Sequence, residues 1–405
     1  MIAILLGIAI PAVVLGRSVF AVIIGVAFIT LFFCKPWRQI VEDLWAQCQR
    51  PFGILILLTF VAWLPNVYLS NFPGRSFEAV FRTLLFVGIA AMFFAYLKSD
   101  QRLLKICYQA FIVSALIAII FALTALFFIP EIYWALRLKG WFSTPLQSEL
   151  KSFSAMAVLA VPVLILAVYR LRNVWTVMGV VVCIGFIALV WETYNRSAIA
   201  GCLAIALTVV VIWTVRGGNR KLAFAGIGAV GSLIVAVIVW LRLRRGHYLT
   251  EISGDDWLLP LWLVDFERQT IWTTAWEFGL ESPWFGIGAN AINFVPGADV
   301  AIEGASGLHV MPAHPHSWFF EVFAETGAVG LAALIVTIVF MVLKWFRDYR
   351  QYNNPGVLAA IAIMAGYWSS GLFNFSYWSA WWQLSFMISL ALCFAYVDRR
   401  PQDRA

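Results

Sequence analysis

The sequence predicts an all-helical integral membrane protein with about twelve transmembrane helices. Of its 405 residues, 62% are hydrophobic and only 12% are charged, and the mean hydropathy is +0.87. Apolar runs close to the length of about 20 residues that crosses a bilayer recur along the whole chain. This composition excludes an ordinary soluble protein. Without tandem repeats or low-complexity linkers, one polytopic membrane domain over residues 1–405 is the simplest organisation.

The apolar runs define the expected spans in order. They lie at residues 2–16, 18–34, 51–70, 77–97, 106–129, 154–169, 174–192, 197–215, 222–241, 317–343, 356–374 and 376–396. Only Arg17 separates the first two runs, so one bent helix is the alternative there.

Loop charge predicts the orientation, because cytoplasmic loops of membrane proteins carry the excess of Lys and Arg. Six loops hold 17 of the 28 basic residues: 35–50, 98–105, 170–172, 216–221, 344–350 and 399–404. Placing them in the cytoplasm puts both termini there as well. Residues 71–76, 130–153, 193–196 and 242–316 then lie on the far side.

The loop 242–316, between the ninth and tenth spans, is long enough for a small subdomain. Within it, residues 264–280 repeat apolar side chains at helical spacing, which predicts an amphipathic helix at the membrane interface. Pro283, Gly286 and Gly288 follow as a turn-rich break. We therefore expect short amphipathic helices in this loop.

All four histidines of the chain lie in this loop, and His316 has the most informative setting. It stands where the loop enters a span, and Ser317 could cap the following helix. The positive end of a helix disfavours imidazolium, so a neutral ring able to accept a proton is expected. Exclusion of histidine from apolar spans is the plainer explanation of the clustering. Gly327 and Gly330 are interpreted mainly as small residues for close helix packing.

Arginines are the second group of candidate site residues. Arg196 stands at the outer mouth of two spans, and its guanidinium could hold a phosphate together with the amides of the helix start. Arg268 lies on the amphipathic helix; Arg82 and Arg137 are further candidates for binding an anionic substrate. Lipid-contacting arginine and simple surface charge are the alternatives at these positions.

Other chemistries have weaker support in the sequence. Asp255 with Asp256, or His314 with His316, could contribute to a metal site, but a hard cation usually needs more oxygen ligands. The sequence has no phosphate-binding loop and no Gly-x-Ser-x-Gly motif. Nucleic acid is not expected as a partner, since topology accounts for the basic excess.

Three stretches resemble a known family. Residues 316–330 read His-Ser, nine residues, then Gly-x-x-Gly; the order Arg268-Gln-Thr-Ile-Trp-x-x-Ala and Pro283-x-x-Gly-x-Gly precedes them; and Arg-Ser-Ala occurs at Arg196. Together they are similar to the motifs of bacterial O-antigen ligases, within the O-antigen ligase and polymerase superfamily.

The resemblance implies a GT-C-like glycosyltransferase in the inner membrane of a Gram-negative bacterium, with a periplasmic active site and no cofactor or metal. The donor would be O-antigen on undecaprenyl pyrophosphate and the acceptor a sugar hydroxyl of lipid A–core; other lipopolysaccharide assembly proteins are possible partners. By the motif match, His316 would be the general base, and Arg196 and Arg268 would bind the departing pyrophosphate. Arg82, Arg137 and Ser317 would contribute to substrate binding, and the displacement would invert the anomeric carbon.

Three other functions stay open. An O-antigen polymerase shares the donor but transfers it to another lipid-linked repeat unit. A protein O-oligosaccharyltransferase would use a Ser or Thr hydroxyl as acceptor. A transporter of lipid-linked sugars belongs to a different class and would place charged or broken helices at mid-membrane.

Overall fold

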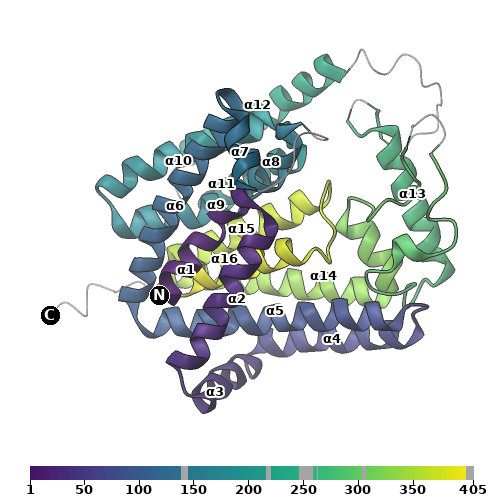
Figure 1. Cartoon of the computed structure of the whole chain (residues 1–405), viewed down its shortest axis with the longest axis horizontal. Coiled ribbons are helices and arrows are strands. Elements are labelled where there is room, and N and C mark those ends of the chain that lie inside the picture. The colour runs from purple at the N-terminus through teal and green to yellow at the C-terminus, as the bar shows by residue number, and fades with distance from the viewer. Residues whose placement is uncertain (138–144, 216–219, 246–258, 262, 303–306, 398–405) are drawn as a thin grey trace.

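The computed structural model describes the chain except residues 138–144, 216–219, 246–258, 262, 303–306 and 398–405 (Figure 1). The described residues form helices, with one isolated bridge between Ala301 and His309 and no strand. The predicted all-helical class is confirmed. The helices are α1 (Ile2–Ala9), η1 (Pro11–Leu15), α2 (Arg17–Cys34), α3 (Trp37–Cys48), α4 (Pro51–Leu69), α5 (Pro73–Ser99), α6 (Gln101–Phe127), α7 (Pro130–Leu136), α8 (Leu146–Ala155), α9 (Ala157–Leu171), α10 (Val174–Glu192), α11 (Arg196–Val215), α12 (Arg220–Arg245), α13 (Phe266–Glu281), η3 (Ile292–Phe294), α14 (Trp318–Tyr352), α15 (Pro355–Gly371) and α16 (Ala380–Phe394).

Seven described helices are long and apolar enough to cross a membrane: α2, α4, α5, α6, α10, α11 and α14. The pair α8 and α9, bent by 47°, would make an eighth. All of them overlap predicted spans, so a multi-pass membrane protein is confirmed. The number of twelve is not confirmed, because α1, α15 and α16 are only 8, 17 and 15 residues long, and the apolar part of α12 is also short.

The first predicted span, 2–16, is not one continuous helix. The α-helix α1 ends at Ala9, and the 3-10 helix η1 begins at Pro11, which has no amide hydrogen to donate to a helix. Gly16, with a φ of 132°, then turns the chain, and Arg17 begins α2. The two N-terminal segments are therefore separate, and Arg17 lies at the turn between them.

Figure 1 shows α4, α5 and α14 running side by side, with α3 near one end of the molecule and α13 near the other. Helices α11, α15 and α9 pack together in a second group. The largest cluster of buried apolar residues joins α1, α2, α6, α9, α15 and α16, and a smaller one joins α4, α5 and the start of α14. These packed helices hold the loops at the α13 end in fixed places.

Helix α13 occupies the position predicted for the amphipathic helix in the long loop. It packs against the first turns of α14, where Trp272 stacks on Phe320 and Trp276 stacks on Phe323, with ring centroids 5.4 Å and 4.4 Å apart. The long loop therefore folds back over the beginning of α14. The placement of α13 at a membrane interface and the status of the long loop as a subdomain stay predictions.

Candidate active site

His316 lies in the last turn of the long loop, directly before α14. Its backbone has a φ of 56°, a left-handed conformation that is uncommon for residues with a side chain and that often marks functional sites. Ser317 takes the N-cap position of α14, but its side chain makes no capping hydrogen bond. The prediction that Ser317 caps the helix through its hydroxyl is therefore wrong; its carbonyl accepts a hydrogen bond from the amide of Glu321 instead.

His314 lies beside His316, with ring centroids 4.3 Å apart. Burial, together with the neighbouring imidazole and Arg268, lowers the pKa of His316 to about 3. Burial lowers the pKa of His314 to about 4, with smaller contributions from Arg17 and Arg268. Both rings are therefore neutral near pH 7, and desolvation outweighs the helix end as the cause.

Two ring nitrogens of this pair have no partner among the described residues. They are Nδ1 of His316 and Nε2 of His314, and both are buried. Buried polar atoms of native proteins are nearly always hydrogen-bonded, so an unpaired one calls for an explanation such as a catalytic role. A neutral imidazole with an unpaired nitrogen can accept a proton or a hydrogen bond from a substrate.

Arg268, on α13, lies near both histidines. Its Nη1 donates a 2.7 Å hydrogen bond to the carbonyl of Phe373 in the connection between α15 and α16. Its positive charge opposes protonation of both imidazoles. The structure thus brings together Arg268 and His316, which are 48 positions apart in the sequence.

Arg196 begins α11 and joins the same region through α13. Its Nη2 donates to Oδ2 of Asp265 at 2.8 Å, and Asp265 is the N-cap residue of α13. Lys151, on α8, lies within electrostatic range of both Arg196 and Arg268. The amide of Ala198 donates to Oδ1 of Asn195, so the start of α11 offers fewer exposed amides than predicted.

The connection between α15 and α16 links these parts, and sequence reasoning missed it. Phe373 receives the hydrogen bond from Arg268, and the side chain of Asn374 donates to Oγ of Ser197 at 3.3 Å, next to Arg196. Asn374 also lies beside both imidazoles and partly offsets the lowering of their pKa values. No local motif marks Asn374, because its contacts come from distant parts of the chain.

Glu321 anchors this connection from inside α14. It is 1% exposed, and its carboxylate accepts hydrogen bonds from Oγ of Ser376 at 2.6 Å and from the amide of Tyr377 at 2.5 Å. Glu325, one turn later, accepts from the amides of residues 290–292 at 2.8, 2.8 and 2.9 Å and from Nε1 of Trp378. A signal for both was present, since two glutamates within an apolar span indicate a function.

Gly327 forms a break in α14. Its φ of 68° and ψ of −174° are not helical, and a Cβ there would lie 2.3 Å from the carbonyl carbon of Trp284. The interpretation of Gly327 as a helix-packing residue is therefore wrong. Gly330 fits that interpretation, because its carbonyl accepts from Nε1 of Trp63, and a Cβ would lie 2.8 Å from the Trp63 ring.

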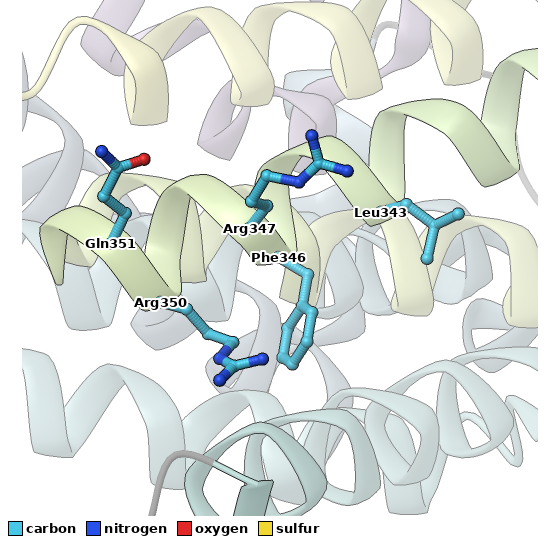
Figure 2. A pocket seen from close by; sticks show the side chains of 5 residues that line it. All are labelled: Leu343, Phe346, Arg347, Arg350 and Gln351. Atoms are coloured by element: carbon cyan, nitrogen blue, oxygen red, sulfur yellow. The ribbon is translucent and has the colours of Figure 1, made fainter.

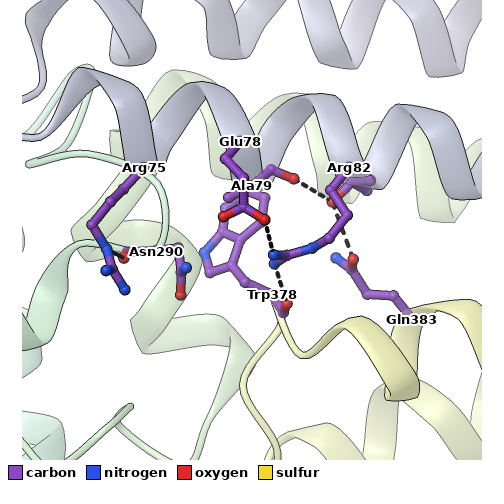
Figure 3. A network of polar contacts seen from close by, with 8 residues as sticks. Arg75, Glu78, Ala79, Arg82, Asn290, Trp378 and Gln383 are labelled. Carbon is purple, nitrogen blue, oxygen red and sulfur yellow. Dashed lines mark hydrogen bonds and ion pairs between the residues drawn. The ribbon is translucent and has the colours of Figure 1, made fainter. Parts of the chain in front are cut away.

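The remaining predicted residues have other neighbours. Arg82 pairs with Glu78 and donates to the carbonyl of Trp378 at 2.8 Å (Figure 3). Arg137 pairs with Glu149 at 2.6 Å and donates to the hydroxyl of Tyr133. Neither has a contact in the structure with His316, Arg196 or Arg268.

A hollow of about 460 Å³ lies at the far end of α14 and does not belong to this site. It is lined by Leu343, Phe346, Arg347, Arg350 and Gln351 (Figure 2). Asp255, Asp256, His247 and Lys139 lie outside the described residues. Within the described part, no group of three His, Cys, Asp or Glu side chains could hold a metal ion.

The middle of the chain matches a known family. Residues 183–335 fit the model of the family described as O-antigen ligase. We call residues 183–335 the ligase-family segment. The ligase-family segment contains Arg196, Arg268 and His316, together with Glu321 and Glu325. The resemblance seen in the sequence motifs is thereby confirmed.

Curated relatives with the provisional name polysaccharide ligase are similar to parts of the chain. A protein of Rickettsia bellii is 29% identical over 201 residues, 45% of this chain and 48% of the relative. A protein of Rickettsia prowazekii is 29% identical over 105 residues, 25% of each chain. A protein of Rickettsia conorii is 25% identical over 117 residues, 28% of each. The chain thus matches less than half the length of these relatives.

Proposed function

We propose that this protein transfers an O-antigen polysaccharide from undecaprenyl pyrophosphate to a sugar hydroxyl of lipid A–core on the periplasmic face of the inner membrane. The observation that carries the proposal is the pair of neutral, partly unpaired imidazoles of His314 and His316 beside Arg268. The ligase-family segment around them supports the choice of polysaccharide as the transferred group.

His316 acts as the general base. Its pKa of about 3 keeps the ring neutral at the working pH, so the ring can take the proton of the acceptor hydroxyl as the oxygen attacks. A base with so low a pKa is weak in the free protein. Binding of an anionic donor beside it raises its pKa, because a nearby negative charge favours imidazolium.

Arg268 and Arg196 stabilise the departing pyrophosphate. The acceptor oxygen forms a bond to the anomeric carbon while the bond from that carbon to the pyrophosphate oxygen breaks, and undecaprenyl pyrophosphate leaves with the electron pair. Guanidinium groups pair well with phosphate oxygens and stabilise the charge that develops there. Direct displacement inverts the anomeric carbon, and the residues named supply the base and the charge without a metal ion.

A complementation experiment tests the proposal. A deletion strain is supplied with the parent gene or with His316→Ala, and both lipopolysaccharide and undecaprenyl-linked glycans are analysed. We expect core-only lipopolysaccharide, with long polymer retained on the carrier, in the deletion and the His316→Ala strains. Normal polymer attachment by His316→Ala would overturn the role of His316. Core bearing a single repeat, without long polymer on the carrier, would indicate a polymerase instead.

A further inference from the structure

Arg17 is a cation that the proposed reaction does not yet use. It begins α2, and its guanidinium is fixed in place from two sides. Nε and Nη2 donate to Oγ of Ser152 at 3.1 and 2.8 Å, and the group lies over the ring of Trp381, 4.9 Å from its centroid. The described residues give Arg17 no carboxylate at ion-pair distance; Glu149, which pairs with Arg137, acts on Arg17 only through its charge.

Helix α8 connects Arg17 to the other cations of the site. Ser152 contacts Arg17, whereas the preceding residue, Lys151, lies within electrostatic range of Arg196 and Arg268. The side-chain amide of Asn195 donates to the carbonyl of Lys151 at 2.9 Å and ties α8 to the turn before Arg196. Helix α8 therefore contacts Arg17 through Ser152 and the turn before Arg196 through Lys151.

The histidine pair lies within reach of both groups. Arg17 and Arg268 both oppose the protonation of His314. Arg268 and His314 do the same at His316. Arg17 thus acts on the pKa of His314, whereas Arg268 acts on the pKa of both rings. A displacement at the anomeric carbon needs the nucleophile and the leaving group on opposite sides of that carbon.

We propose that Arg17 forms a second anion subsite, which binds a phosphate group on the acceptor glycolipid, apart from the donor pyrophosphate at Arg196 and Arg268. This inference rests on the proposed function. An arginine stacked on an aromatic ring loses little freedom on binding, and its remaining N–H groups suit phosphate oxygens. Its hydrogen-bond partner Ser152 is neutral, and the nearby carboxylate of Glu149 is already paired with Arg137. In this role, Arg17 orients the substrate that supplies the hydroxyl.

Kinetics with two forms of the acceptor test the subsite. The full-length protein is purified into nanodiscs of zwitterionic lipid and assayed with lipid-linked donor and with phosphorylated or dephosphorylated acceptor. The variants are Arg17→Gln, Arg17→Lys and the matched control Arg75→Gln. Arg75 is also exposed and also lies over an aromatic ring, that of Phe294 at 3.9 Å.

For Arg17→Gln, we expect the KM for the phosphorylated acceptor to rise by about 10-fold, the size typical of one lost charge-assisted hydrogen bond. The KM for the donor stays at the parent value. With dephosphorylated acceptor, parent and Arg17→Gln become equal. Arg17→Lys keeps the charge, so its KM for the phosphorylated acceptor should lie between those of the parent and Arg17→Gln. Arg75→Gln should behave as the parent with both acceptors.

Three results would overturn the subsite. An equal loss by Arg17→Gln on both acceptors would indicate a structural role. A raised KM of Arg17→Gln for the donor would indicate that Arg17 binds the donor pyrophosphate together with Arg196 and Arg268. A defect that appears only when anionic lipid is added to the nanodiscs would make lipid head groups its ligand. A parent-like Arg17→Gln with an inactive His316→Ala would sink this inference alone, whereas an active His316→Ala would sink the proposed function.

Discussion

The amide of Ala328 donates a 2.8 Å hydrogen bond to the carbonyl of Pro283, at the point where α14 loses its own helical bonds. The amide of Val329 donates likewise to Trp284, and the amides of Ile287 and Gly288 donate to the carbonyls of Ala324 and Glu325. The Pro283–Gly288 segment therefore fills the break in α14 from both sides. The segments Pro283–Gly288 and Ala324–Val329, whose paired residues are 37 or 45 positions apart, form one interlocked unit.

Substitution of Gly327 tests this interlock. Gly327→Ala puts a methyl group against the peptide joining Trp284 and Phe285 in a left-handed conformation, so we expect a loss of stability of about 1–3 kcal/mol or more. Gly25→Ala in α2 is the control, since nothing lies within 4 Å of its Cβ position. Thermal unfolding in detergent should show a lower midpoint for Gly327→Ala only. Equal midpoints would contradict the interlock.

We expect the charge beside His316 to control how the transfer rate depends on pH. With a pKa of about 3, the imidazole of the donor-free parent is neutral from pH 5 to pH 8 and adds no acid limb to the pH profile of kcat/KM. Asn374→Asp places a carboxylate beside the ring, which raises its pKa because a negative charge favours imidazolium. The base is then protonated on the acid side, so we expect activity to fall toward pH 5 and to recover toward pH 8.

Asn374→Leu separates this effect from simple loss of contact. It removes the polar side chain without adding charge, so its rate should be lower at every pH, with no new acid limb. The measurement is the rate of each variant divided by that of the parent from pH 5 to pH 8. A constant ratio for Asn374→Asp would show that residue 374 does not act on the base.

Glu321 is a positioning residue for the connection that holds Arg268 and Asn374. Glu321→Ala leaves the buried amide of Tyr377 without its acceptor, at a cost of about 1–3 kcal/mol, and frees Phe373 from its fixed place. We expect kcat to fall more than donor KM rises, with partial rescue in Glu321→Gln. Glu42→Gln, on an exposed pair with Arg38, is the control. Full activity of Glu321→Ala would refute this role.

At the proposed pyrophosphate-binding pair, Arg268 and Arg196, we expect the reaction to depend on the planar shape of the guanidinium group as well as on its charge. Arg268→Lys keeps a positive charge but loses the planar fork that donates to the carbonyl of Phe373 and, in the proposed reaction, to a phosphate. We expect kcat/KM to fall by about 100-fold, the range for losing one donor to a developing oxyanion. In Arg196→Lys, kcat/KM should fall less, because Asp265 can still orient the positive charge of the lysine. Parent-like kinetics in both variants would contradict the proposed binding of pyrophosphate by Arg268 and Arg196.

The sequence by itself determined the membrane class and the resemblance to the O-antigen ligase family, and it named His316, Arg196 and Arg268 as candidate site residues. Apolar runs must be helical in lipid, where backbone groups have no other partners, so composition alone is informative. The spacing from His316 to Gly330 and the motif at Arg268 are local in the chain. They could therefore be found without knowing how the helices pack.

Only the tertiary structure decided which distant residues meet. Arg17 and Asn374 approach the histidines from opposite ends of the chain, and no local pattern encodes a contact over such a separation. Helical periodicity does not reveal a left-handed residue within a helix, so the sequence predicts only a packing role for Gly327. The low pKa of His316 depends on burial by α13, α14 and the α15–α16 connection. That desolvation exists only once the helices have packed.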